Sequence, residues 1–80
     1  MAPKVVAYHG WDDPMVPPAD VVALGQELTG ADWQIHAFGG AKHAFMNPGA
    51  NAPEMGIEYH ERTAHRAWTG MAGFLGEVLA

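Results

Sequence analysis

The chain has 80 residues, enough for one small domain, and a chain of this size buries only about 60% of its unfolded surface on folding. Its formal net charge is −5 with only four Lys and Arg residues, which argues against a nucleic-acid surface, because such a surface needs clustered cations. The chain is 49% apolar, as globular domains are, yet no stretch approaches the roughly 20 apolar residues of a membrane span. We therefore expect a soluble, cytoplasmic protein that binds neither nucleic acid nor membrane.

The first 30 residues have the pattern of a strand followed by a helix. Residues 5–8 form a short apolar run that ends close to Gly10, which is typical of a strand buried on both faces of a parallel sheet. Two prolines at 17–18 then open a segment with apolar residues at helical spacing, and Gly30 closes it. The spacing predicts an amphipathic helix between these prolines and Gly30.

A second strand and a second helix follow. Residues 33–38 alternate between two faces as a strand does, and the residues at 39–51 are predicted as a loop. Residues 59–79 are predicted as a helix, because apolar residues recur there at steps of three and four. This apolar stripe consists of Ala64, Ala67, Trp68, Met71, Phe74, Leu75 and Val78.

Packing has to stabilise the C-terminal helix. Three glycines in its interior each cost up to about 1 kcal/mol relative to alanine, so the helix would fray alone in water. Trp33, Trp68 and Phe74 are the large side chains that we interpret as packing residues.

The order strand, helix, strand, helix indicates an α/β fold with two parallel strands joined by a right-handed crossover. Two strands have two open edges, and independent sheets usually need three or more strands or substantial packing against helices. We therefore expect something to cover those edges: a second copy, exchanged elements or a further N-terminal portion. The partner that this argument predicts is a homo-oligomer or a complementing chain.

Two polar side chains follow the two predicted strands. Asp13 comes just after the first strand and His43 just after the second, and a parallel sheet brings both points to one edge. A carboxylate that accepts the imidazole Nδ1 proton leaves Nε2 to deprotonate a nucleophile and then protonate a leaving group. The arrangement favours an acid–base pair, although Asp13 before a proline is also ordinary turn chemistry, and His43 beside glycines is also typical of a solvated loop.

The pair lies in two short segments whose order and spacing are informative. Residues 10–17 read GWDDPMVP, a Gly-x-x-Asp loop followed by Pro and Val, and residues 43–45 read His-Ala-Phe. With an Ala-Trp pair in the terminal helix, these segments resemble the C-terminal part of the α/β-hydrolase fold, most closely the dienelactone hydrolase family, through nearly the whole chain. By that resemblance Asp13, rather than Asp12, is the triad acid, His43 is the base, and the substrate is a small ester or lactone.

The resemblance leaves the nucleophile without a residue in this chain. In that fold the nucleophile precedes the acid and the base in chain order. The resemblance implies a Cys or Ser as nucleophile, and neither residue occurs in this chain. The resemblance therefore implies a single partial α/β-hydrolase-like domain over residues 1–80, in which water or a partner supplies the attack. The threonines and tyrosines have no suitable placement, and Lys42 would need a depressed pKa to attack a carbonyl.

Three apolar side chains flank the expected site and allow two interpretations. Trp11, Met15 and Phe45 are candidates for substrate binding, because apolar side chains line most small-molecule pockets. Aromatic and Met residues near strand ends are also typical of simple core packing. Both interpretations stay open at this point.

The remaining histidines, at positions 9, 36, 60 and 65, raise a metal or small-ligand module as a third interpretation. His60 and His65 are five residues apart and miss the spacing that puts two ligands on one helix face, and no acidic neighbour completes a zinc motif. We expect no metal and no cofactor. This module ranks behind an ester or lactone hydrolase, and behind a non-catalytic, self-associating fragment in which Asp13 and His43 are inherited bystanders.

Overall fold

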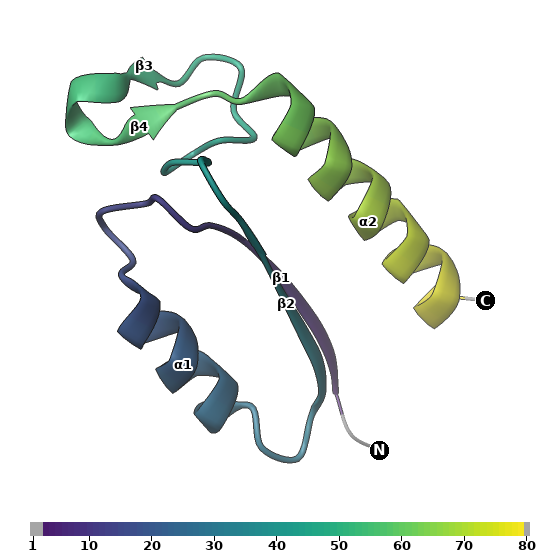
Figure 1. Ribbon diagram of the computed structural model, residues 1–80. Coiled ribbons are helices and arrows are strands. Elements are labelled where there is room, and N and C mark those ends of the chain that lie inside the picture. The colour runs from purple at the N-terminus through teal and green to yellow at the C-terminus, as the bar shows by residue number, and fades with distance from the viewer. Residues whose placement is uncertain (1–2, 80) are drawn as a thin grey trace.

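The computed structural model describes residues 3–79 and has a two-stranded sheet with a helix on each side (Figure 1). β1 (Lys4–Gly10) and β2 (Asp32–Phe38) pair in parallel and in register over their full lengths. α1 (Pro18–Glu27) and α2 (Glu61–Leu79) lie on opposite sides of these strands. The predicted element order and the parallel pairing are confirmed.

The ends of α1 follow from residues with restricted or unusual backbone geometry. Pro17 precedes the helix in an extended conformation, and Pro18 is the first helical residue, where a missing N–H costs no hydrogen bond. Asp20 in the first turn complements the positive end of the helix dipole. Gly30 follows with a φ of 93°, a left-handed conformation that glycine adopts without steric cost. The prolines and Gly30 thus bound the helix as the sequence predicts.

The strands and the large aromatic residues are less buried than the sequence predicts. Residues 5–9 are half-buried rather than buried on both faces, because the sheet has two strands and one helix covers each face. Trp33 is 42% exposed, although its ring lies over Gly25 of α1. Trp68 is 58% exposed, so its prediction as a packing residue is wrong, whereas Phe74 is half-buried.

The buried core is small and lies between the start of α2 and the carboxyl ends of the strands. Its buried apolar residues are Ala41, Phe45, Ala64 and Ala67. Phe38 packs edge-on to Phe45 with ring centroids 5.8 Å apart, and Tyr8 stacks on both Phe38 and His36 at 6.3 and 5.2 Å. Aromatic pairs of this kind add about 0.5–1.5 kcal/mol beyond their buried area. The tightest packing is therefore at the end of the sheet that carries Asp13 and His43.

A small hairpin that the sequence did not predict precedes α2. β3 (Asn51–Ala52) pairs with β4 (Ile57–Glu58) in antiparallel orientation, and a short 3-10 turn, η1 (Pro53–Met55), connects them. Gly56 ends this turn with a φ of 75°. Each strand has only two residues, too few to show the alternation from which strands are predicted.

α2 begins two residues after its predicted start. The Nδ1 atom of His60 accepts the N–H of Thr63 at 3.3 Å, and the carbonyl oxygen of His60 accepts the N–H of Ala64 at 2.8 Å. His60 therefore caps the helix, a position where Ser, Thr, Asn and Asp are more usual. Neither helix in the described part of the chain combines the length and the hydrophobicity that crossing a membrane requires.

We expect Gly73→Ala to raise the free energy of unfolding by up to about 1 kcal/mol, because alanine favours the helix and a Cβ at this position meets no atom within 4 Å. Gly70→Ala should lack this gain, since its Cβ would lie 2.8 Å from the hydroxyl of Tyr8 and 3.2 Å from its ring. Urea unfolding followed by circular dichroism measures both variants. Equal gains would contradict the close packing of α2 on Tyr8.

Candidate active site

The loop after β1 passes very close to the loop after β2. Gly10 ends β1, and a Cβ on it would lie 2.6 Å from the carbonyl oxygen of Ala41, so the approach requires glycine. The N–H of Trp11 donates to the carbonyl oxygen of Phe38 at 2.9 Å, and the N–H of Asp12 donates to that of Ala41 at 3.0 Å. Backbone hydrogen bonds therefore continue past the strands and hold the two loops together.

Asp13 is buried, with 8% of its surface exposed, and both oxygens of its carboxylate have a partner. Oδ1 accepts the N–H of Met15 at 2.8 Å, and Oδ2 lies 3.0 Å from Nδ1 of His43. Because an ionised carboxylate only accepts hydrogen bonds, Nδ1 carries the proton, and Nε2 of the neutral ring keeps its lone pair. The structure thus brings the two predicted catalytic residues into hydrogen-bond contact.

The backbone of His43 is held by the hairpin. Its N–H donates to the carbonyl oxygen of Gly56 at 2.9 Å, and its carbonyl oxygen accepts the N–H of Glu58 at 3.2 Å. Ala44 follows with a φ of 59°, in the left-handed region that costs a non-glycine residue about 1–2 kcal/mol. The His43 side chain itself is 43% exposed. Its backbone is therefore fixed while its ring stays open to solvent.

The surroundings of Asp13 favour its ionised form. Burial works to raise its pKa, but the hydrogen bond from His43, the hydrogen bond from the Met15 amide and the charges of His43 and His9 together outweigh burial. The pKa of Asp13 therefore lies below its ordinary value. The carboxylate therefore stays ionised at neutral pH and accepts the hydrogen bond that Nδ1 of His43 donates.

A cavity of about 330 Å³ adjoins Asp13 and His43. Its other lining residues are Tyr8, His9, Gly10, Val16, Lys42, Ala44, Phe45 and Met46. Phe45 lines the cavity, whereas Trp11 and Met15, the other two residues predicted to bind substrate, do not line it and are 47% and 50% exposed. The volume is in the range that holds a small molecule.

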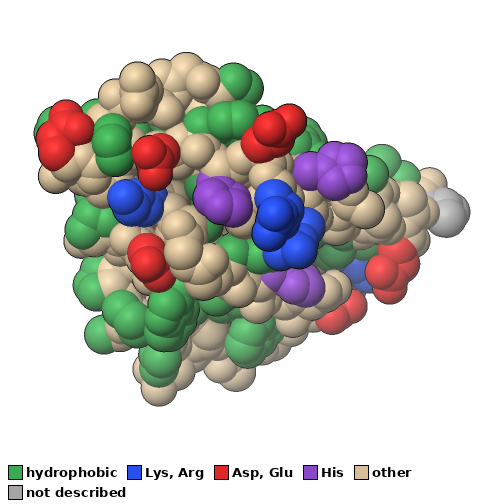
Figure 2. All heavy atoms as spheres, turned by 45° about the horizontal axis from the view of Figure 1, so that its top comes forward, with side chains coloured by type: hydrophobic (Ala, Val, Ile, Leu, Met, Phe, Trp, Pro, Cys, Tyr) green, Lys and Arg blue, Asp and Glu red, His purple; other side chains and the backbone are tan. Residues whose placement is uncertain are grey.

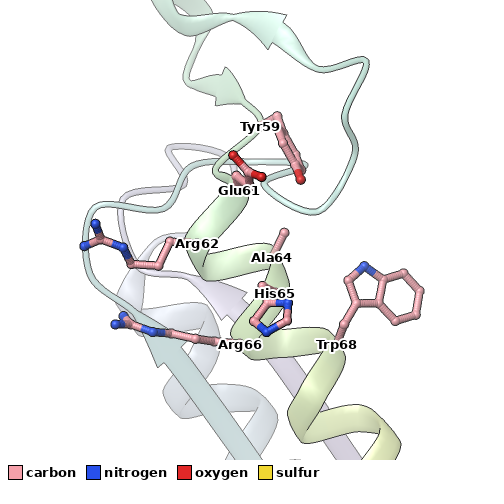
Figure 3. A pocket seen from close by; sticks show the side chains of 7 residues that line it. All are labelled: Tyr59, Glu61, Arg62, Ala64, His65, Arg66 and Trp68. Carbon is pink, nitrogen blue, oxygen red and sulfur yellow. The ribbon is translucent and has the colours of Figure 1, made fainter.

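A wider hollow of about 600 Å³ lies on α2 and the residues before it (Figure 3). It is lined by Tyr59, Glu61, Arg62, Ala64, His65, Arg66 and Trp68. Figure 3 shows that Arg62 and Arg66 extend to the opposite side of the helix from Trp68. Neither Asp13 nor His43 lines this hollow, so we place the candidate site at the smaller cavity.

The other histidines have separate surroundings. Figure 2 shows His side chains spread over one face among acidic and basic residues. Nε2 of His36 lies 3.1 Å from Oε1 of Gln34, and His60 caps α2. The His9 ring is edge-on to Trp11 with centroids 6.4 Å apart. Across residues 3–79, no three His, Asp or Glu side chains gather in a way that fits a metal ion.

Three contributions to the site were not predicted from the sequence. Met15 was predicted to contribute its side chain, but it contributes its backbone N–H to Asp13, a turn contact that the Asp-Pro sequence could have indicated. His9 lines the cavity, and its buried Nε2 has no hydrogen-bond partner among the described residues. Gly56 contacts His43 from the hairpin, and no periodic pattern indicates that hairpin.

The parallel sheet and the acid and base at its carboxyl edge define an α/β-hydrolase-type chain. The model of the dienelactone hydrolase family matches residues 1–79, and the chain belongs to that family. By its description, that family consists of hydrolases. No curated protein sequence matches the chain.

One solved structure similar to this chain is the crystal structure of a dienelactone hydrolase-like promiscuous phosphotriesterase from metagenomic libraries. The TM-score is 0.84 and the sequence identity is 32%. The match covers 92% of this chain and 32% of that protein, so this chain spans about a third of that protein's length.

We expect Asp13→Asn to remove part of the pH dependence of stability. Because the pKa of Asp13 is lowered in the folded state, ionised Asp13 adds to the free energy of unfolding above its unfolded-state pKa of about 4. This contribution is lost as the pH falls through the folded-state pKa. Urea titrations at neutral and acidic pH should therefore show a steeper acid loss for the parent chain than for Asp13→Asn.

The matched control for this comparison is Asp32→Asn, at the exposed start of β2. It removes one carboxylate that lies at the opposite end of the sheet from His43. An equal change in the acid loss of stability for both variants would contradict a special environment for Asp13.

Proposed function

We propose that this chain forms the acid–base part of a dienelactone hydrolase-like carboxylic ester or lactone hydrolase. In this proposal His43 is the general base and then the general acid, and Asp13 orients its ring. The observation that carries the proposal is the 3.0 Å contact between Oδ2 of Asp13 and Nδ1 of His43 beside a cavity of about 330 Å³. Membership of a hydrolase family supports it.

The proposed reaction uses an attacking group that is not a Ser or Cys of this chain. It is a water molecule, or a side chain from a complementing chain. As its oxygen or sulfur bonds to the acyl carbon, Nε2 of His43 takes its proton, and the intermediate then collapses while that proton passes to the leaving alkoxide oxygen. Where the attacker is a side chain, a water that His43 deprotonates in the same way then hydrolyses the acyl intermediate, and the released side chain recovers the proton. Asp13 remains ionised throughout and stabilises the imidazolium.

The cavity suggests a small substrate with an apolar part. Phe45, Met46 and Val16 give the cavity an apolar wall. We retain Trp11 and Met15 as contacts only for a substrate that extends beyond the cavity wall, since both are about half exposed. A lactone suits this site because ring opening keeps the leaving oxygen attached to the acyl part.

The proposal includes a partner, either a second copy or a complementing chain. The similar solved protein is about three times as long as this chain. The additional length is enough for further strands and helices beside β1 and β2. A partner that brings a nucleophile to the cavity completes the site. The cytoplasmic location inferred from composition stays a prediction.

A second candidate is a non-catalytic, self-associating fragment. Exposed apolar side chains favour it: Trp68 is 58% exposed, Val22 61% and Leu79 79%. The outer edges of β1 and β2 pair with no other strand in the described residues. In this alternative the chain associates through these surfaces, and Asp13 and His43 have no catalytic role.

Activity on an activated ester and on a lactone tests the first candidate. We expect His43→Ala to lower kcat/KM by about 100-fold or more, because general acid–base catalysis contributes about 10²–10⁴-fold. Asp13→Asn should have an effect in the same direction, since it removes the negative charge that stabilises the imidazolium and replaces one of the two acceptor oxygens with a donor. A phosphotriester belongs in the same assay, because the similar solved protein is described as a promiscuous phosphotriesterase.

The matched control is His65→Ala, which removes an exposed imidazole from α2 and should leave kcat/KM unchanged. Activity that survives both His43→Ala and Asp13→Asn would contradict the proposed mechanism. A parent chain with no activity on any of the three substrates would favour the non-catalytic alternative.

Light scattering on the purified chain tests association. We expect a mass that is a multiple of the 8.6 kDa chain, because association removes exposed apolar surface and open strand edges from water. A dilution series measures how tight the association is. A monomer mass at all concentrations would contradict self-association.

A further inference from the structure

One glycine of the hairpin fixes the backbone of the base. The carbonyl oxygen of Gly56 accepts the N–H of His43 at 2.9 Å, and the N–H of Glu58 donates back to the carbonyl oxygen of His43 at 3.2 Å. These two bonds enclose Ile57, which forms an isolated parallel bridge with His43. Figure 1 shows the hairpin above the carboxyl ends of β1 and β2. His43 is therefore positioned by the hairpin as well as by β2.

The same glycine meets the acid loop through the ring of Pro14. Gly56 has a φ of 75°, and a Cβ on it would lie 2.6 Å from Cδ of Pro14 and nearer still to Cγ. Distances under 3.0 Å essentially never occur for real Cβ atoms, so the ring fits there only because Gly56 has no side chain. Pro14 directly follows Asp13, and its ring restricts the backbone between them. A displacement of Pro14 is thus passed on to Asp13.

We propose that Gly56 is a positioning residue that sets the separation of Asp13 and His43. It acts on His43 through its carbonyl oxygen and on Asp13 through the space that it leaves for Pro14. A small displacement is enough to break the contact. An increase of about 0.6 Å in the 3.0 Å distance between Oδ2 of Asp13 and Nδ1 of His43 would take it beyond hydrogen-bond range. The catalytic meaning of this role rests on the proposed function, whereas the positioning itself does not.

Two other glycines with positive φ show why this role belongs to Gly56. Gly30 has a φ of 93° and Gly40 a φ of 80°, but a Cβ on either would meet no atom within 4 Å. Replacement of Gly30 by alanine therefore adds backbone strain without a clash. Because Gly30 precedes β2, at the opposite end of the sheet from His43, it is the matched control.

The experiment compares Gly56→Ala with Gly30→Ala by NMR on the whole chain. We expect Gly56→Ala to move the titration midpoint of the Asp13 carboxyl carbon upward, because loss of the His43 hydrogen bond raises the pKa of Asp13. The Nδ1 proton signal of His43 should weaken in the same variant. Gly30→Ala should change neither, and His9, whose charge also acts on Asp13, is the same in both.

Removal of the clash should restore the pair. Pro14→Ala deletes Cγ and Cδ and leaves a Cβ 3.6 Å from the added methyl group, which is ordinary van der Waals contact. The double variant Gly56→Ala with Pro14→Ala should therefore have the same Asp13 midpoint as Pro14→Ala alone. Different midpoints in that comparison, or an effect of Gly56→Ala no larger than that of Gly30→Ala, would overturn the proposal.

These readouts remain decisive if a variant is unstable or the chain is inactive. Should Gly56→Ala fail to fold, the comparison of the double variant with Pro14→Ala still tests the proposal, because neither contains the clash. The NMR signals need no turnover, so an inactive parent would contradict the proposed function and leave the positioning test intact. With an active parent, kcat of Gly56→Ala should fall by up to about 100-fold with little change in KM.

Discussion

The parallel register of β1 and β2 is the constraint on which the candidate site depends. Because both strands run in the same direction, their carboxyl ends lie at one edge, and an acid and a base 30 residues apart meet there. Gly10 is opposite Phe38 in this register, and its missing side chain lets the two loops approach each other. A slip of one residue would move Asp13 by about 3.3 Å, enough to break its 3.0 Å contact with His43.

Burial is distributed so that the end of the sheet with the site is the best packed. Ala67 of α2 is buried there in a cluster with Phe45 and Ala41, and Ala64 is buried as well, whereas α1 has no buried residue. Because local stability follows buried apolar contact, we expect α1 and the far ends of the strands to open before the loops with Asp13 and His43. A partner that covers the exposed surfaces would then stabilise the fold without rearranging the pair.

Elements with a long periodic pattern could be predicted from the sequence, and short ones could not. The apolar stripe of α2, the helical spacing of apolar residues in α1 and the alternation of β2 each span enough residues to define an element. The meeting of Asp13 with His43 followed from topology alone, because each comes just after a parallel strand. The two-residue strands of the hairpin show no period, and the exposure of Trp68 depends on how little sheet there is to cover it.

The two members of the pair differ in exposure, and in the proposed reaction this difference separates what these residues supply from what water or a partner supplies. Asp13 is 8% exposed and holds two hydrogen bonds, while the His43 ring is 43% exposed and turns only Nδ1 to Asp13. Orientation of the base is therefore achieved by contacts within these residues. The proposed reaction takes its nucleophile from water or a partner, and each donor to the developing oxyanion is worth about 2.7–4 kcal/mol of barrier. Under this proposal, water attack with the pair alone is slow. A partner then has most to add on the exposed side of His43, rather than on the side where Asp13 is shielded from water.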